Sequence, residues 1–171
     1  PKTSTGLFAL KVPRHLWQKI ADNAGVKLTE ADIKPQRADL GFWEWMSNHA
    51  EVPLCITEGA KKAGALLSAG YGAVALPGIN NGYRTPKDSN GKRIGKSHLI
   101  PQLAKLAIPG RDIYLVFDQD SKPKTIKAVN AAIKKTGYLI QKAGCQVRVA
   151  TWNSQLGKGV DDLIANQGQE S

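Results

Sequence analysis

The chain has 171 residues, of which 42% are hydrophobic, so it can bury one substantial core, and its composition excludes a collagen, a coiled coil and a largely disordered chain. Its 24 Lys and Arg residues against 14 Asp and Glu residues give a net charge of +10, which favours nucleic acid as a partner, although lysines scattered for solubility would give the same total. No apolar run approaches the roughly 18 residues of a membrane span and no signal peptide is visible, so we expect a cytoplasmic protein without a membrane partner.

The first 51 residues are expected to form a helical extension packed on the main domain. The chain begins at Pro1 without a methionine, so we expect it to be a piece of a longer polypeptide. Residues 13–25 have apolar side chains on one helical face and end in glycine, which predicts a short helix. After a polar connector, the aromatic segment 41–46 predicts either a helix packed against the core, which we favour, or an exposed stacking platform.

Residues 52–171 show strands alternating with helices. Strands are predicted at 53–57, 73–76, 112–117 and 145–152, and helices at 60–69, 98–107 and 125–143. This order predicts an α/β fold, a doubly wound and mainly parallel sheet of about four strands with both faces covered. Cys55 and Cys145 fall in apolar runs, and we interpret them as buried thiols, not as zinc ligands or a disulfide.

Acidic residues follow three of the predicted strands. Glu58 ends the first strand, Asp118 and Asp120 follow the third, and Asp161 and Asp162 come after the fourth. Ligands bind beyond the carboxyl ends of such strands, and oxygen ligands suit Mg²⁺ or Mn²⁺, so the set predicts a divalent-metal site. Each acid also has a structural interpretation. The charge of Glu58 would stabilise the N-terminus of the helix that follows it, Asp118 and Asp120 would be turn residues, and Asp161 would be an N-cap.

Basic residues surround this predicted site. The glycine-rich and asparagine-rich loop 78–96 contains one acid, Asp88, and five cations, which we expect to contact a nucleic-acid backbone: Arg84, Lys87, Lys92, Arg93 and Lys96. Lys61, Lys62 and Lys158 are expected to bind phosphate beside the acids. The other interpretations are a merely solvated insertion for the loop and ordinary solvated residues for Lys61 and Lys62.

Four ordered segments resemble the Toprim domain of primases, topoisomerases and related nucleases. They are residues 56–63 (ITEGAKKA), 75–78 (ALPG), 116–120 (VFDQD) and 158–164 (KGVDDLI). More narrowly, they are similar to a Toprim-like domain of unknown function in large replication-type proteins of cyanobacteria, plasmids and phages, often beside a helicase region.

The resemblance implies a role for each acid. Glu58 would act as general acid or base, Asp118 and Asp120 would hold Mg²⁺ or Mn²⁺, and Asp161 or Asp162 would complete a second metal's shell. The chain departs from the pattern at Lys62, where many primases carry an acid, so the local charge is more positive than in those enzymes.

Together these features predict Mg²⁺-dependent phosphoryl transfer on DNA or RNA, expected to be single-stranded, by primase-like nucleotidyl transfer from nucleoside triphosphates or by nuclease action. Helicase or other domains of a longer replication protein are the expected partners. A second hypothesis is a non-catalytic module that binds metal and nucleic acid. A third, a phosphoacceptor receiver domain, fits less well because the first strand offers only Glu58.

Overall fold

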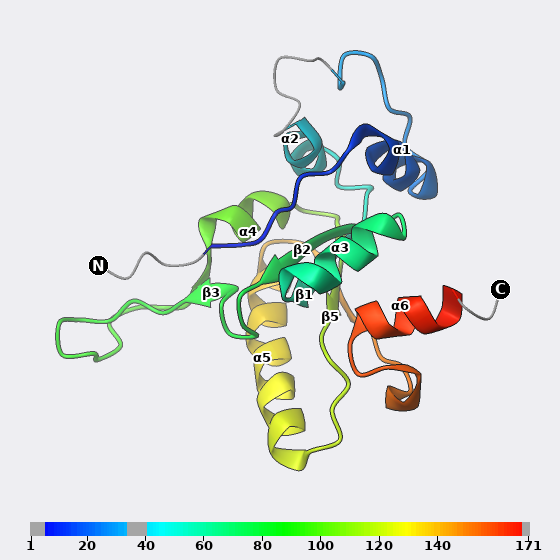
Figure 1. Cartoon of the computed structure of the whole chain (residues 1–171). Helices are drawn as coiled ribbons and strands as arrows, with labels where there is room; N and C mark the ends of the chain where they lie inside the picture. Colours follow the sequence, from blue (N-terminus) through cyan, green and yellow to red (C-terminus); the bar gives the residue numbers. More distant parts are fainter. Residues whose placement is uncertain (1–5, 34–40, 169–171) are drawn as a thin grey trace.

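The computed structural model describes residues 6–33 and 41–168, so parts of the expected N-terminal extension, residues 1–5 and 34–40, lie outside it, as do residues 169–171. Its centre is a parallel sheet of four strands in the order β2-β1-β5-β6 (Figure 1). The strands are β1 (Leu54–Glu58), β2 (Gly72–Leu76), β5 (Asp112–Val116) and β6 (Gln146–Val149). The predicted α/β fold with a parallel sheet is confirmed.

Helices cover both faces of the sheet, as a doubly wound fold requires. In Figure 1, α3 (Ala60–Ser68) and α6 (Val160–Gly168) lie on one face, and α4 (Pro101–Leu106) and α5 (Pro123–Lys142) lie on the other. The four residues of β1 that precede Glu58 are buried, because β1 has a strand on each side and helices above and below. None of the described helices is both long and apolar enough to cross a membrane.

The predicted helix at 98–107 is wrong at its start. His98 and Leu99 form strand β4 (His98–Leu99), which pairs antiparallel with β3 (Tyr83–Arg84) in a separate two-stranded sheet. The helix begins only at Pro101, since a residue before proline is held in an extended conformation, as Ile100 is with ψ 148°. Residues 83–99 therefore form a hairpin, which we call the arm, and Figure 1 shows its tip projecting away from the sheet.

The predicted strand 145–152 is also shorter in the structure, because β6 ends at Val149. Beyond it the chain turns, and the indole Nε1 of Trp152 donates to the carbonyl oxygen of Gly157 at 2.7 Å. Both cysteines are free and buried, as predicted, and burial raises the pKa of Cys55 to about 12.

The N-terminal helices share the core of the sheet. Helix α1 (Arg14–Asn23) contributes Trp17, which packs edge-on against Phe42 of α2 (Gly41–Asn48) with ring centroids 5.9 Å apart. Phe42, Trp45 and Met46 are buried, so the packed interpretation of segment 41–46 is confirmed. Phe8 adds two backbone hydrogen bonds to Ala75 at the outer edge of β2.

A buried arginine joins α2 to the start of β5. The Nη2 group of Arg111 donates to the carbonyl oxygen of Met46, in the last turn of α2, and to that of His49, the residue that follows the helix. The side chain is fully buried, and this desolvation lowers its pKa to about 10. The guanidinium therefore remains charged at neutral pH, and it adds a charged donor to two carbonyl groups that also accept backbone hydrogen bonds, at 3.3 Å from the N–H of His49 and at 3.2 Å from the N–H of Val52.

We expect Arg111→Met to lower the free energy of unfolding by about 2 to 4 kcal/mol, because it removes two hydrogen bonds that a buried charged group donates to the carbonyl oxygens of Met46 and His49. Urea denaturation measures the change. The matched control is Arg148→Met, which removes an exposed guanidinium 4.0 Å from Asp112 and should cost less than about 0.5 kcal/mol. Equal losses in the two variants would contradict the assigned role of Arg111.

Candidate metal and phosphate site

Strand pairing brings the first two acidic segments to one edge of the sheet. Because β1 and β5 are parallel, with Thr57 opposite Val116, Glu58 and the segment after β5 emerge side by side. The chain leaves β1 through Gly59, whose φ of 87° only glycine adopts easily, and then enters α3. Glu58 is half-buried at this point. Strands β1 and β5 carry their following helices on opposite faces, and such a switch point is where doubly wound sheets bind ligands.

The loop before α6 closes over the segment that follows β5. The backbone N–H of Gln119 donates to the carbonyl oxygen of Lys158 at 2.9 Å, which ties the two loops together. Asp120 then receives two partners: its Oδ1 accepts from the backbone N–H of Lys122 at 2.8 Å, and its Oδ2 lies 2.8 Å from Nζ of Lys158. The interpretation of Asp120 as a turn residue is therefore confirmed, and its carboxylate also forms an ion pair.

This pair shifts both pKa values. The Lys158 ammonium, helped by the Lys122 N–H, lowers the pKa of Asp120 below its ordinary value of 3.8. In return Asp120 raises the pKa of Lys158, and the charges of Asp118 and Glu58 add to that rise. Three of the predicted acids therefore raise the pKa of Lys158, and its side chain is protonated throughout the neutral pH range.

Helix α6 settles which of its two acids faces the site. Asp161 lies in the first turn with its side chain only 13% exposed, whereas Asp162 is exposed to solvent. The helix starts at Val160, so Asp161 is a helical residue and its interpretation as an N-cap is wrong. Oδ2 of Asp161 lies 3.3 Å from Nζ of Lys61, while Oδ1 is buried and accepts no hydrogen bond from any described residue.

Two lysines from the first turn of α3 reach the acids. Nζ of Lys62 lies 2.9 Å from Oδ1 of Asp118, and the side chains of both are mostly covered. Lys61 is 86% exposed, so its solvated interpretation largely holds although it touches Asp161. Lys62 instead has a defined contact inside the site, at the position where the sequence departs from the Toprim pattern.

Gly159 allows these groups to converge, a role that its place in the motif did not reveal. A Cβ atom there would fall against Oδ1 of Asp161 and 2.9 Å from Cε of Lys62. The same point lies within 3.5 Å of Oδ1 of Asp118. Two buried carboxylate oxygens, one from the segment after β5 and one from α6, therefore lie near the same point, and Oδ1 of Asp161 has no partner among the described residues. This donor set fits a hard cation such as Mg²⁺.

The acids are not assembled into a ready metal site. Within residues 6–33 and 41–168, no group of three His, Cys, Asp or Glu side chains is placed to hold an ion as it stands. Each of Asp118, Asp120 and Asp161 has a lysine ammonium beside it instead. A bound cation would therefore have to displace at least Lys62.

The basic residues of the arm lie apart from these pairs. Lys87, Lys92, Arg93 and Lys96 are exposed on the hairpin, and Arg84 turns back to donate to the carbonyl oxygens of Asn81 and Tyr83. In the described part of the chain, none of these cations forms an ion pair with Glu58, Asp118, Asp120 or Asp161. Their contact with nucleic acid stays a prediction.

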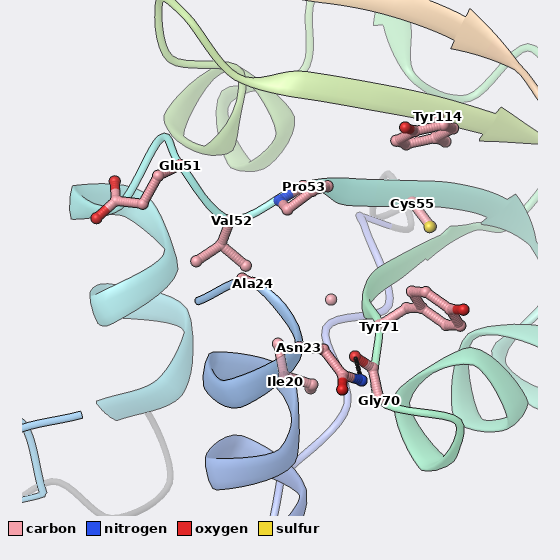
Figure 2. A pocket seen from close by; sticks show the side chains of 11 residues that line it. Ile20, Asn23, Ala24, Glu51, Val52, Pro53, Cys55, Gly70, Tyr71 and Tyr114 are labelled. Carbon is pink, nitrogen blue, oxygen red and sulfur yellow. Dashed lines mark hydrogen bonds between the residues drawn. The ribbon is translucent and has the colours of Figure 1, made fainter. Parts of the chain in front are cut away.

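Two cavities lie at opposite ends of the strands. One, of about 260 Å³, is bounded by α5 and the ends of β5 and β6, and its walls include Asp118, Asp120, Asn130 and Val149. The other, of about 360 Å³, lies at the amino ends of the strands beside α1, and Figure 2 shows Cys55 between the rings of Tyr71 and Tyr114 on its wall. Of these two cavities, only the first adjoins the predicted acids.

We expect Lys62→Met to bind Mn²⁺ about tenfold more tightly than the unmodified protein, because the change removes a positive charge that competes for Asp118. Isothermal titration calorimetry measures the affinity. Lys96→Met, which removes an exposed lysine of the arm, serves as the control and should change it little. Unchanged or weaker binding in Lys62→Met would contradict competition at Asp118.

Lys158→Met should raise the pKa of Asp120 towards its ordinary value, since it removes the first cause of the depression. Carboxyl chemical shifts followed by NMR during an acid titration give this pKa directly. A depressed pKa stabilises the fold above pH 3.8, and this contribution is lost as the pH falls below that value. The stability of the variant should therefore depend less on pH in this acidic range. If the pKa of Asp120 were the same in the variant and the unmodified protein, the ion pair of Asp120 with Lys158 would be refuted.

Comparison with known proteins places the chain in a family. An uncharacterized protein of Picosynechococcus sp. (strain ATCC 27264 / PCC 7002 / PR-6) is 55% identical over 172 residues, an alignment that covers 100% of this chain but only 16% of that protein. No solved structure matches the chain. The model of one family, described as a domain of unknown function (DUF3854), matches residues 42–171. Since that match covers most of the chain, the chain belongs to the DUF3854 family.

Proposed function

We propose that this chain is a Toprim-like domain that uses a divalent cation to act on the phosphodiester backbone of nucleic acid. The observation that carries the proposal is the convergence of Asp118 and Asp161. Asp118 follows β5 and Asp161 lies in the first turn of α6, and their Oδ1 atoms are both buried and lie within 3.5 Å of one point beside Gly159. A buried carboxylate oxygen without a donor is costly, and a bound cation would remove that cost.

Asp118 and Asp161 are the residues that would hold Mg²⁺ or Mn²⁺, and Asp120, which the Lys122 N–H and Lys158 hold in place before α5, would support them. When bound, the ion would supply charge stabilisation at a phosphoryl oxygen. Asp162, which faces solvent, is left out of this ligand set. Lys62 would leave Asp118 on metal binding, and its ammonium would then be free to contact a phosphate.

Glu58 is the residue that we assign to proton transfer. It is half-buried at the end of β1, and its charge reaches Lys158. A carboxylate at this edge, beside but not within the Asp118 and Asp161 pair, can take a proton from an attacking oxygen or give one to a leaving oxygen. Formation and hydrolysis of a phosphodiester need the same group, and we place primase-like nucleotidyl transfer slightly ahead of nuclease action.

The surrounding cations would bind the substrate. Lys61 is exposed at the start of α3, and Lys158, whose pKa Asp120 raises further, is charged at neutral pH. The adjoining cavity of about 260 Å³ has apolar side chains and the amide of Asn130 on its walls, with Asp118 and Asp120 at its edge, and we propose that a nucleobase would pack there. We therefore propose a nucleotide or a nucleic-acid strand as the ligand.

The domain would act within a larger protein. Its relative from Picosynechococcus is far longer, since the matched segment makes up 16% of that protein. We propose a plasmid-type or phage-type replication protein, with helicase or other domains in the same polypeptide and a cytoplasmic location.

A non-catalytic module that binds metal and nucleic acid is the second candidate. The lysine partners of Asp118, Asp120 and Asp161 favour it, because they neutralise the acids that catalysis would need. Such a module would bind phosphate through Lys61, Lys62 and Lys158, and neighbouring domains of the parent protein would perform the chemistry.

The experiment that separates the two candidates uses the intact parent protein with Mn²⁺, nucleoside triphosphates and a labelled single-stranded template. Catalysis predicts new oligonucleotides or cleavage products, with a loss of about 100-fold or more in Glu58→Gln because the general acid or base is gone. Glu30→Gln, a change of the same kind in the N-terminal region, is the matched control and should retain activity. If the intact protein binds nucleic acid but yields no product, the result would contradict catalysis and support the non-catalytic binding module.

A further inference from the structure

Helix α5 carries positive charge only. Its 20 residues include five lysines and no acid: Lys124, Lys127, Lys134, Lys135 and Lys142. A helix whose lysines serve solubility alone commonly pairs them with acids three or four positions away, which stabilises the helix. Here no such pair exists within the helix, and the like charges at 124 and 127 repel each other slightly. No acid within α5 offsets the repulsion between these lysines.

The lysines share the outer face of α5. Positions 124, 127, 134, 135 and 142 fall on one side at 3.6 residues per turn, and the opposite side buries Ala132, Thr136 and Ile140 against the sheet. Tyr138 lies on the lysine side and is 63% exposed. We call this surface the lysine face.

The lysine face connects the arm with the acidic site. Nζ of Lys135 lies over the ring of Tyr83 in β3, 5.5 Å from its centroid, so the face adjoins the basic arm midway along the helix. The helix begins at Pro123, directly after Lys122. The backbone N–H of Lys122 donates to the carboxylate of Asp120, so the start of α5 lies next to the acidic site. Positive charge therefore continues from the acidic site along the helix and sideways onto the arm.

The length of the face matches an extended polyanion. At 1.5 Å per residue the helix is about 30 Å long, which corresponds to about nine base pairs of duplex at 3.4 Å per pair. An anionic membrane would fit less well, because a membrane-bound amphipathic helix inserts its apolar side. That side of α5 is packed on the sheet, with Ala132 and Ile140 buried.

We propose that a nucleic-acid backbone lies along the lysine face of α5, leading away from the acidic site past the arm. This inference rests on the proposed function, since it assumes that the domain binds nucleic acid, and it adds where the strand runs. The phosphate contacts of Lys127, Lys134 and Lys135 position the strand without reading its sequence.

The test compares two triple variants of the domain by fluorescence anisotropy with a labelled 30-nucleotide DNA, single-stranded and duplex, over a series of salt concentrations. One variant is Lys127→Gln, Lys134→Gln and Lys135→Gln. The matched control removes three positive charges elsewhere, Arg14→Gln, Lys27→Gln and Lys105→Gln, all at exposed positions. Glutamine is a good helix former, so both should fold, and circular dichroism checks this.

We expect the α5 variant to lose at least tenfold in affinity, and the slope of log K against log salt to fall by about 2 to 3, at 0.7 to 0.9 per lost phosphate contact. The control should change affinity less than twofold. Equal changes in both variants would overturn the path along α5 while leaving the proposed function intact. No binding by the unmodified domain would overturn both, and α5-dependent binding to phosphatidylserine vesicles in place of DNA would make the face a membrane surface.

Discussion

The parallel pairing of β1 with β5 is the constraint on which the site depends. It sets Thr57 opposite Val116 and so delivers Glu58 and Asp118 to the same edge of the sheet. The third acid, Asp161, comes from α6, whose loop is fixed to the same place by the hydrogen bond from Gln119 to Lys158. Residues that are about 60 and 40 positions apart in sequence thus meet because three loops leave neighbouring strands in one direction.

At this edge the electrostatics are nearly balanced. Three carboxylates face three ammonium groups, and the shortest contacts, Lys62 to Asp118 and Lys158 to Asp120, are 2.9 and 2.8 Å. Such a site would not repel phosphate strongly, and each of these three carboxylates has an ammonium partner although Oδ1 of Asp161 accepts no hydrogen bond from a described residue. Metal and phosphate would bind in an exchange: the cation takes the carboxylates, and the released lysines take the phosphate. If the domain binds both ligands as proposed, Lys62 would couple metal binding to phosphate binding, which an acid at this position would not do.

Much of the fold could be predicted from the sequence, since the strand and helix patterns of residues 52–171 are regular and the chain order of strands and helices limits the topology. The start of α4 could not, because segment 98–100 looks helical until its pairing with β3 is known. Pro101 was the local signal for the boundary.

The sequence alone indicated which acidic residues belong to the candidate site, but it did not indicate which lysines pair with them. Asp161 could not be distinguished from Asp162, since the choice depends on the first residue of α6 and hence on how the preceding loop closes. The pairs of Lys61 with Asp161 and of Lys62 with Asp118 join residues about 100 and 56 positions apart, and no local pattern reports such contacts. The need for glycine at 159 likewise depends on side-chain atoms brought in by α3, by α6 and by the segment after β5.

The most direct test of the central claim is an anomalous difference map from crystals of the domain soaked in millimolar Mn²⁺. The account predicts a peak bonded to carboxylate oxygens of Asp118 and Asp161, with the ammonium of Lys62 moved away from Asp118. A map without a peak at this position, in which the Lys62 and Asp118 pair is intact, would contradict it.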